Sequence, residues 1–343
     1  MKHRITIALL ATLILVSCAK QPFEVKGDAV LLNFALSPNG DRVVVFDNTG
    51  VYIYELNSKN RFELSKFDNK SFSDSRSGAV AFSPNGEQIA FSGKFADQSI
   101  DIREIKSNKH ITSIEPPSGN YVTEIEFSPN GQSLIVRSLG SYGNRGKVSC
   151  ESLVDTLTLF NLETGSNIFE ISQCAFLPIQ FSFTANNKLF FYQGTMTPEY
   201  FIYFTDSNTG QLISTDKLNW DEDGNLYNVS PDGKFYFVEK SGFTYLLDSV
   251  SEKEVKVVEG DIIFFHNIDN FIVSDFKNNK SNFVKNDETR CTFEGIAFAP
   301  HALIKRKASV NQEVFAISLE SNTNLQVWDI SSCEKIAEFL FGQ

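Results

Sequence analysis

The sequence predicts an all-β protein built from one repeated unit of four antiparallel strands. A tight turn of the form Ser-Pro-Asn-Gly or Ser-Pro-Asp-Gly occurs four times, each time between two apolar stretches. The turns that begin at Ser37, Ser83 and Ser128 are 46 and 45 residues apart, close to the length of a four-stranded propeller blade. Helical periodicity is rare along the chain. These observations predict a β-propeller of about seven blades, with six or eight as alternatives.

The repeated turn has a conformational explanation. Proline presets φ at the second position, asparagine or aspartate is tolerated at the third, and glycine takes the positive φ that closes the hairpin. We therefore assign each copy to the first hairpin of a blade. The complete copies are Ser37–Gly40, Ser83–Gly86, Ser128–Gly131 and Ser230–Gly233. Weaker copies are Thr184–Asn187, His266–Asp269 and Phe298–Pro300.

Regular strands follow each turn. Arg42–Phe46 exemplifies the second strand of a blade and Val51–Leu56 the third, and both are rich in β-branched and aromatic residues. A polar turn and an outer strand come next, as in Asn167–Ile171. Radial packing of such sheets leaves only short protected strand edges, which limits aggregation. Two modes of ring closure stay open: a strand at Phe23–Lys26 that joins the last blade, or simple packing of the last blade on the first.

The N-terminus has the pattern of a secretory signal peptide. Met1–Arg4 is short and basic, and Ile5–Val16 is almost uninterruptedly apolar. This apolar stretch is too short to span a bilayer comfortably. We therefore expect the segment to direct export and then to be removed.

The end of that segment, Leu15–Cys18, resembles the bacterial lipobox, in which the cysteine thiol receives a diacylglyceryl group. The resemblance implies a lipoprotein signal peptide at 1–17, lipidation of Cys18, a lipidated tether at 18–29 and a propeller domain at 30–343. The membrane is then a partner, held through acyl chains that contribute about 0.8 kcal/mol per buried methylene. Ala19 resembles an outer-membrane sorting signal, so we expect a cell-envelope protein, in the outer membrane if the host has two membranes. An ordinary cleaved signal with a coincidental cysteine is the alternative.

The repeats themselves resemble those of WD40 and TolB-type propellers over roughly residues 30–343. The resemblance rests on the Ser-Pro-Asn/Asp-Gly turns and on Leu325–Ile330, which carries a Trp-Asp dipeptide at the end of a third strand. It implies a divergent propeller of this kind. No Gly-His dipeptide opens the repeats, and a single repeat keeps Trp-Asp at the end of its third strand, so the hydrogen-bonded tetrad of eukaryotic WD40 proteins does not carry over.

Cysteine usage agrees with export, because an even number remains besides Cys18 in a chain directed to an oxidising compartment. Cys150 falls in an insertion between the second and third strands of blade three, and Cys174 follows the fourth strand, so we expect them to form a disulfide. Cys291 in the outer part of blade six and Cys333 at the third turn of blade seven are candidates for a second. Free thiols and a zinc site are the alternatives, although no Cys-x-x-Cys or closely spaced histidine accompanies these cysteines.

Motifs for catalysis and for cofactors are almost absent. The chain has no Gly-x-Ser-x-Gly, no His-Glu-x-x-His and no phosphate-binding glycine loop, and the mature part has only His110, His266 and His301. We therefore expect no catalytic residue, no metal and no cofactor, and we interpret the carboxylates as solvated turn residues. The net charge of −11 argues against a nucleic-acid partner, which requires a basic face.

Two charged clusters have both a functional and a simpler interpretation. Asp221–Asn225 partly resembles a calcium loop, but it lacks the full ligand spacing, and an acidic loop into blade five is the simpler interpretation. Lys305–Lys307 is a basic tripeptide after Pro300 that could touch anionic lipid or an acidic partner. A solvated loop is the simpler interpretation of it.

These features favour a membrane-anchored, non-enzymatic propeller scaffold that binds other envelope proteins, through residues that the sequence does not identify. The first alternative is a lipoprotein that binds a small ligand or the cell wall, which predicts a deep central funnel with aromatic walls. The second is a hydrolase that uses the funnel, which predicts carboxylates and histidines converging on one face.

Overall fold

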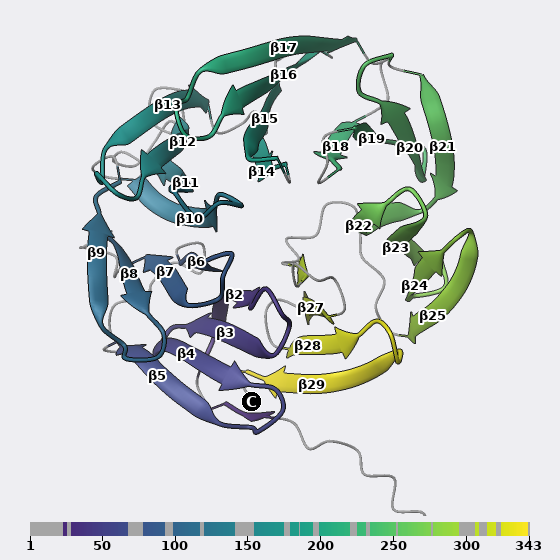
Figure 1. Cartoon of the computed structure of the whole chain (residues 1–343). Coiled ribbons are helices and arrows are strands. Elements are labelled where there is room, and N and C mark those ends of the chain that lie inside the picture. Colours follow the sequence, from purple (N-terminus) through teal and green to yellow (C-terminus); the bar gives the residue numbers. More distant parts are fainter. Residues whose placement is uncertain are drawn as a thin grey trace, which may run out of the picture.

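The computed structural model shows a ring of seven sheets (Figure 1). It describes residues 23–25, 29–67, 78–92, 99–116, 120–140, 154–174, 179–184, 186–194, 199–219, 225–230, 234–251, 253–275, 277–294, 306–308, 314–319 and 324–341. All regular elements in these ranges are strands, and no helix there could cross a membrane. The sheets are antiparallel and four-stranded, apart from a fifth, parallel strand in the last. The predicted all-β, seven-bladed propeller is confirmed.

The first three blades come from the N-terminal half of the chain. Blade one contains β2 (Leu31–Leu36), β3 (Arg42–Asp47), β4 (Gly50–Glu55) and β5 (Arg61–Lys66). Blade two contains β6 (Val80–Phe82), β7 (Gln88–Ser92), β8 (Ile100–Glu104) and β9 (His110–Ile114). Blade three contains β10 (Asn120–Phe127), β11 (Ser133–Gly140), β12 (Val154–Asn161) and β13 (Asn167–Cys174).

The remaining blades follow in chain order. Blade four contains β14 (Ile179–Phe183), β15 (Lys188–Gly194), β16 (Glu199–Asp206) and β17 (Leu212–Asn219). Blade five contains β18 (Asn225–Val229), β19 (Phe235–Lys240), β20 (Phe243–Asp248) and β21 (Glu254–Glu259). Blade six contains β22 (Asp261–Asn267), β23 (Asn270–Asp275), β24 (Lys280–Lys285) and β25 (Glu288–Glu294). Blade seven contains β26 (Arg306–Ala308), β27 (Val314–Leu319), β28 (Asn324–Asp329), β29 (Glu334–Leu340) and β1 (Phe23–Glu24).

The serine of the repeated turn closes the hairpin that the proline and glycine shape. In blade one, the Ser37 hydroxyl accepts a hydrogen bond from the Arg42 amide at 2.9 Å, and Gly40 has φ +73°. The equivalent bonds to Ser83 and Ser128 are also 2.9 Å long. Because each side chain satisfies the first amide of the second strand, the hairpin leaves no buried donor there.

The tight turns of blades two and three each lie against the turn of the preceding blade. The guanidinium of Arg42 donates to the carbonyl oxygen of Gly86 at 2.9 Å. A Cβ atom added to Gly86 would lie 3.3 Å from Cδ of Pro38, so the two turns are in close contact. The proline and the glycine of the repeat therefore position neighbouring blades as well as the hairpin.

Apolar side chains fill the space between neighbouring sheets. Between blades one and two, the buried residues include Val44, Phe46, Ile53, Val80, Ile89 and Phe91. Similar clusters lie between blades two and three and between blades three and four. Others lie between blades five and six, between blades six and seven, and between blades seven and one. Each large side chain that is fully buried contributes about 1.5–3 kcal/mol. The ring is therefore held together mainly by packing between sheets.

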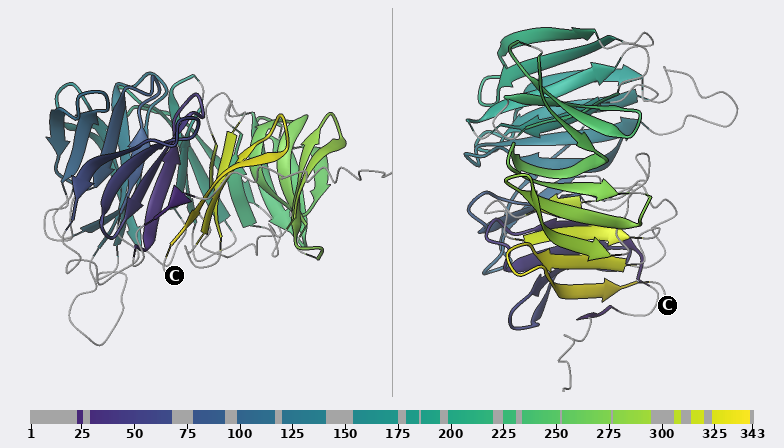
Figure 2. Two further views of the ribbon diagram at one scale, coloured as in Figure 1. Left: turned by 90° about the horizontal axis from the view of Figure 1, so that it is seen from below. Right: turned by 90° about the vertical axis from the view of Figure 1, so that its right-hand side faces the viewer.

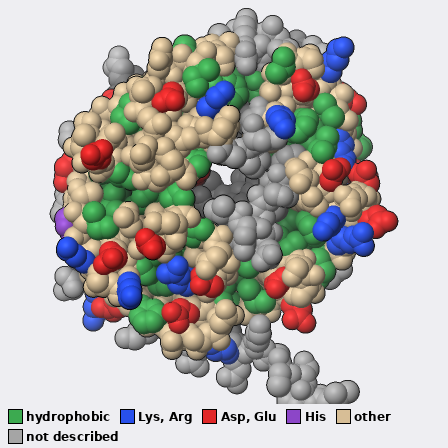
Figure 3. Space-filling model, viewed as in Figure 1, with side chains coloured by type: hydrophobic (Ala, Val, Ile, Leu, Met, Phe, Trp, Pro, Cys, Tyr) green, Lys and Arg blue, Asp and Glu red, His purple; other side chains and the backbone are tan. Residues whose placement is uncertain are grey.

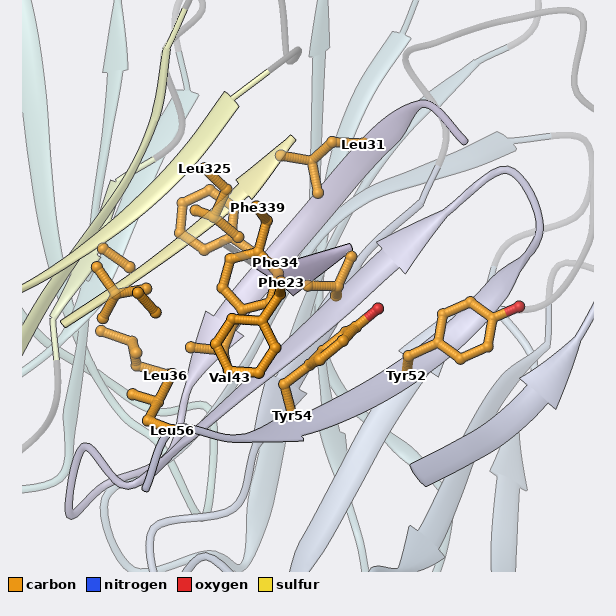
Figure 4. Close-up of a cluster of buried hydrophobic side chains, with 14 of the residues drawn as sticks. Phe23, Leu31, Phe34, Leu36, Val43, Tyr52, Tyr54, Leu56, Leu325 and Phe339 are labelled. Carbon is orange, nitrogen blue, oxygen red and sulfur yellow. The ribbon is translucent and has the colours of Figure 1, made fainter. Parts of the chain in front are cut away.

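The ring closes through its N-terminal strand. Phe23 and Glu24 pair in parallel with Phe339 and Leu340 as a fifth, outer strand. The ring of Phe23 stacks on that of Phe339 at 4.6 Å and meets Tyr54 of blade one edge-on at 5.4 Å (Figure 4). Of the two modes of closure that the sequence left open, strand pairing is the one found. It lies within the range assigned to the tether.

Blade seven corrects one part of the sequence interpretation. Its first strand is Arg306–Ala308 and its second begins at Val314, so residues 309–313 connect these two strands. The weak copy assigned to Phe298–Pro300 lies outside the described residues, and its assignment as the turn between the first two strands of this blade was wrong, because 309–313 connects β26 to β27. Arg306 and Lys307 lie on the innermost strand and not in a loop. The segment 309–313 contains neither proline nor glycine, so it lacks the two strongest turn signals.

Candidate binding surface on the turn face

One face of the ring carries the tight turns. Neighbouring strands are antiparallel, so the connections from first to second strand and from third to fourth strand emerge on the same side. We call this side the turn face; in blades one and two it comprises 37–41, 56–60, 83–87 and 105–109. It is the upper side in the left view of Figure 2 and faces the viewer in Figure 3.

Carboxylates at the ends of third strands close the turns that follow. Asp206 Oδ1 accepts hydrogen bonds from the amides of Asn208 and Thr209 at 3.0 and 2.9 Å. In the same way, Asp248 and Asp329 each accept hydrogen bonds from the backbone amides of the second and third residues that follow them. The amide of Thr209 lowers the pKa of Asp206 because it stabilises the charged carboxylate. The interpretation of these carboxylates as turn residues is confirmed.

The Trp-Asp dipeptide has an architectural role. Asp329 accepts hydrogen bonds from the amide and hydroxyl of Ser331 at 2.8 and 2.6 Å. The indole of Trp328 donates to Gln326 at 3.2 Å and packs edge-on against Phe293 of blade six, with 5.2 Å between the ring centroids. The dipeptide therefore fixes a turn and the contact between blades six and seven.

A disulfide fastens the same pair of blades. Cys291 of β25 is joined to Cys333, in the turn between β28 and β29, with 5.4 Å between their Cα atoms. Cys291 is almost fully buried. The second of the two predicted cysteine pairs is thus confirmed. The first falls outside the described residues, since Cys150 and the side chain of Cys174 are not described, although the backbone of Cys174 pairs with Val154 beside the predicted insertion.

Several residues singled out in the sequence also fall outside the described part. They are Cys18, 221–224, His301 and Lys305, together with the side chain of His266. His110 is described, and its Nε2 lies 2.9 Å from Ser113 Oγ and 3.4 Å from Asp101 Oδ1 on the exposed side of β9. Among the described residues, no group of three His, Cys, Asp or Glu side chains could hold a metal ion.

Two buried carboxylates serve the architecture of single blades. Asp155 is almost fully buried and binds the guanidinium of Arg137 through Nε and Nη2, the latter at 2.7 Å. Asp47 accepts hydrogen bonds from the amides of Thr49 and Gly50 in the β3–β4 turn at 2.7 and 3.0 Å. Burial raises the pKa of both carboxyl groups, against the opposing effect of these partners.

The turn face is hollowed between blades one and two. This groove, which we call the one–two groove, has a volume of about 680 Å³. Its apolar wall is formed by Ile53, Phe62 and Ile105, and the ring of Phe62 is 49% exposed. Its polar lining consists of Arg42, Glu55, Asn85, Gly86, Glu87, Glu104 and Lys106. In Figure 3, carboxylates, basic groups and apolar side chains alternate over this part of the ring, at the lower left.

A second groove occupies the equivalent place between blades two and three. This two–three groove has a volume of about 340 Å³ and an apolar wall of Ile102, Ile111 and Leu162. Its polar lining is mostly uncharged and consists of Gln88, Thr112, Gly131, Gln132, Asn161, Glu163 and Asn208. The side chain of Asn208 is fixed there by the amide of Asn130 at 3.1 Å.

Comparison with known proteins does not extend this description. No family model matches the chain, and no curated protein is detectably similar to it in sequence. The sequence did not reveal either groove, because each is formed by residues of different blades. The local signal in the sequence is an apolar residue, Phe62 or Ile111, that follows a basic or histidine residue at the start of an outer strand.

Proposed function

We propose that the chain is a lipid-anchored, non-enzymatic scaffold of the cell envelope, whose turn face binds other envelope proteins. One observation carries this proposal: a closed, tightly packed ring presents grooves with exposed apolar side chains at the contacts between its blades. Exposed apolar side chains rimmed by polar residues are typical of interaction sites. The carboxylates at the third-strand ends are engaged in turns, which favours binding over acid–base chemistry.

The tether supports an arrangement close to the membrane. The lipobox-like segment ends at Cys18, and β1 begins at Phe23 on the outer edge of blade seven. A fully extended chain between these residues spans roughly 18 Å. A lipid on Cys18 therefore holds the rim near blades seven and one at the membrane and leaves the turn face open to partners.

Fractionation with crosslinking tests both parts of the proposal. Cells that express the wild-type chain are compared with cells that express Cys18→Ser, by crosslinking, membrane fractionation and affinity capture. We expect the wild type in the membrane with a specific envelope protein and the variant in the soluble fraction without it. Wild-type membranes from which no protein is captured would overturn the scaffold function. A Cys18→Ser chain that fractionates like the wild type would overturn the anchor.

The two–three groove favours a second candidate function, binding of a small neutral ligand. Its fixed amide side chains offer both donors and acceptors, which suits hydroxylated molecules such as saccharides. Isothermal titration with cell-wall saccharide fragments tests this candidate. Saturable heat that disappears in Asn161→Ala would support it, and the absence of any saturable signal would exclude it for those fragments.

A further inference from the structure

We infer that the one–two groove is the docking site for a basic, extended peptide segment of the partner protein. The inference rests on the proposed scaffold function and identifies where on the turn face a partner binds and what chemistry it presents. It depends on three properties of the groove: unpaired carboxylates, an exposed aromatic ring, and an internal comparison with the two–three groove.

The carboxylates of the groove are held by neutral groups. Glu55 accepts hydrogen bonds from Ser58 and Asn60, Glu87 from Asn85, and Glu104 from Ser107. None of these three glutamates forms an ion pair within the described part of the chain. Their negative charge is therefore available to a cation from outside.

The basic residues of the groove compensate this charge only in part. Arg42 is already engaged by Asp41 at 3.2 Å and by the carbonyl oxygen of Gly86 at 2.9 Å. Lys106 is then the one further cation among the lining residues, against three glutamates. The groove consequently attracts cations and repels acidic segments, in keeping with charge complementarity at protein interfaces.

The exposed ring of Phe62 lets the groove bind a cation through a cation–π contact as well as through the carboxylates. A lysine or arginine side chain can lay its methylenes on the half-buried Ile105 while its charge meets the exposed ring of Phe62 and the carboxylates. Blade one already contains this contact, because the guanidinium of Arg61 lies 3.9 Å from the ring centroid of Tyr52. An aliphatic side chain alone would leave the three carboxylates without a positively charged partner.

The two–three groove supplies the comparison. Glu87 follows the glycine of the tight turn in blade two, and Gln132 occupies the equivalent position in blade three. Glu104 and Asn161 both end third strands, and Phe62 and Ile111 are both second residues of outer strands. The same backbone positions thus carry charge and an aromatic ring in one groove, and amides and an aliphatic side chain in the other.

The test uses the full acylated chain in non-ionic detergent and measures fluorescence anisotropy of a labelled Gly-Lys-Val-Lys-Val-Lys-Gly peptide. We expect this peptide to bind at least about tenfold more tightly than its Glu-containing counterpart, and more weakly as salt is added. The double variant Glu87→Gln/Glu104→Gln should weaken binding about three- to tenfold. Phe62→Ala should weaken it about two- to fivefold.

Glu163→Gln is the matched control, because it removes one carboxylate from the two–three groove on the same face. We expect it to leave binding of the lysine peptide unchanged. Equal binding of the two peptides, or an equal loss in Glu163→Gln and in the double variant, would overturn the assignment. The substituted residues are exposed, so thermal melts of the variants should match the wild type.

Capture from crosslinked cells separates the two proposals. If the double variant captures the envelope partner as well as the wild type does, the docking site is wrong and the scaffold function stands. If neither chain captures a protein, the scaffold function itself fails. Loss of the partner in the double variant, with Glu163→Gln retaining it, is the result we expect.

Discussion

Single residues in this protein show how burial and hydrogen bonding oppose each other. Asp47 is 1% exposed, and its Oδ1 binds the turn while its Oδ2 is buried without a hydrogen-bond partner. Burial raises its pKa above the ordinary value of 3.8. Tyr54 on the same side of the sheet has its hydroxyl buried without a partner, and burial raises its pKa to about 12. Asp47 and Tyr54 thus place polar atoms in the interior of blade one.

The raised pKa of Asp47 makes a prediction about pH. The unfolded chain loses the proton at lower pH than the folded chain, so this residue destabilises the fold progressively as pH rises from 3.8 through the raised pKa. Asp47→Asn keeps the acceptor for Thr49 and removes the titration. We expect the free energy of unfolding of the variant, relative to wild type, to increase from pH 3.5 to pH 7 in urea titrations. A difference that stays constant with pH would contradict this.

The glycines of the turns permit a matched comparison. Gly86 and Gly165 have φ of +69° and +68°, but an added Cβ would meet Pro38 and Arg42 only at Gly86. Gly165→Ala should cost about 1 kcal/mol of stability from the positive φ alone. Gly86→Ala should cost more, because the turn of blade one must shift. Urea titration of both variants tests this, and equal losses would show that contact between turns does not contribute.

At the scale of elements, the sequence predicted the turns that contain proline and glycine. The turns at Ser37–Gly40 and Ser83–Gly86 were recognised because their residues force the hairpin, and the strands around them followed from composition. The first hairpin of blade seven was misplaced, since 309–313 contains neither residue. The two grooves were not predicted, because facing residues of different blades have no local pattern.

The strand β1 is expected to be essential to closure of the ring. Phe23 stacks on Phe339 and meets Tyr54, so Phe23→Ala opens a cavity between blades seven and one. We expect a loss of about 3 kcal/mol in the free energy of unfolding. Phe62→Ala is the control, as its side chain is 49% exposed and its removal should change stability by less than about 0.5 kcal/mol. Similar melting of the two variants would argue against closure by β1.

The disulfide between Cys291 and Cys333 fastens blade seven on its other side. It joins residues 42 positions apart, so removing it should lower stability by about 3–4 kcal/mol. The variant Cys291→Ser/Cys333→Ser, compared with wild type under non-reducing conditions, tests this value by urea titration. Adding reductant to the variant isolates any effect of the other cysteines. Unchanged stability of the variant would mean that packing alone holds blade six on blade seven.

The whole molecule combines a closed ring of seven sheets with a negative net charge. Blade seven is held on one side by the disulfide and on the other by β1, so the ring is secured where its first and last described strands pair. In the proposed scaffold, the lipid on Cys18 would lie near β1 and the partner would bind the turn face, so anchoring and recognition would involve different parts of the ring. A net charge of −11 favours solubility and basic partners.

The most direct test of the scaffold function is photocrosslinking from defined positions in cells. A photoreactive residue is placed at Lys106 on the turn face, or at Lys277 in the β23–β24 turn on the opposite face, in the otherwise unchanged chain. We predict a discrete adduct with one envelope protein from position 106 and none from position 277. Adducts from position 277 alone, or from neither position, would contradict the account.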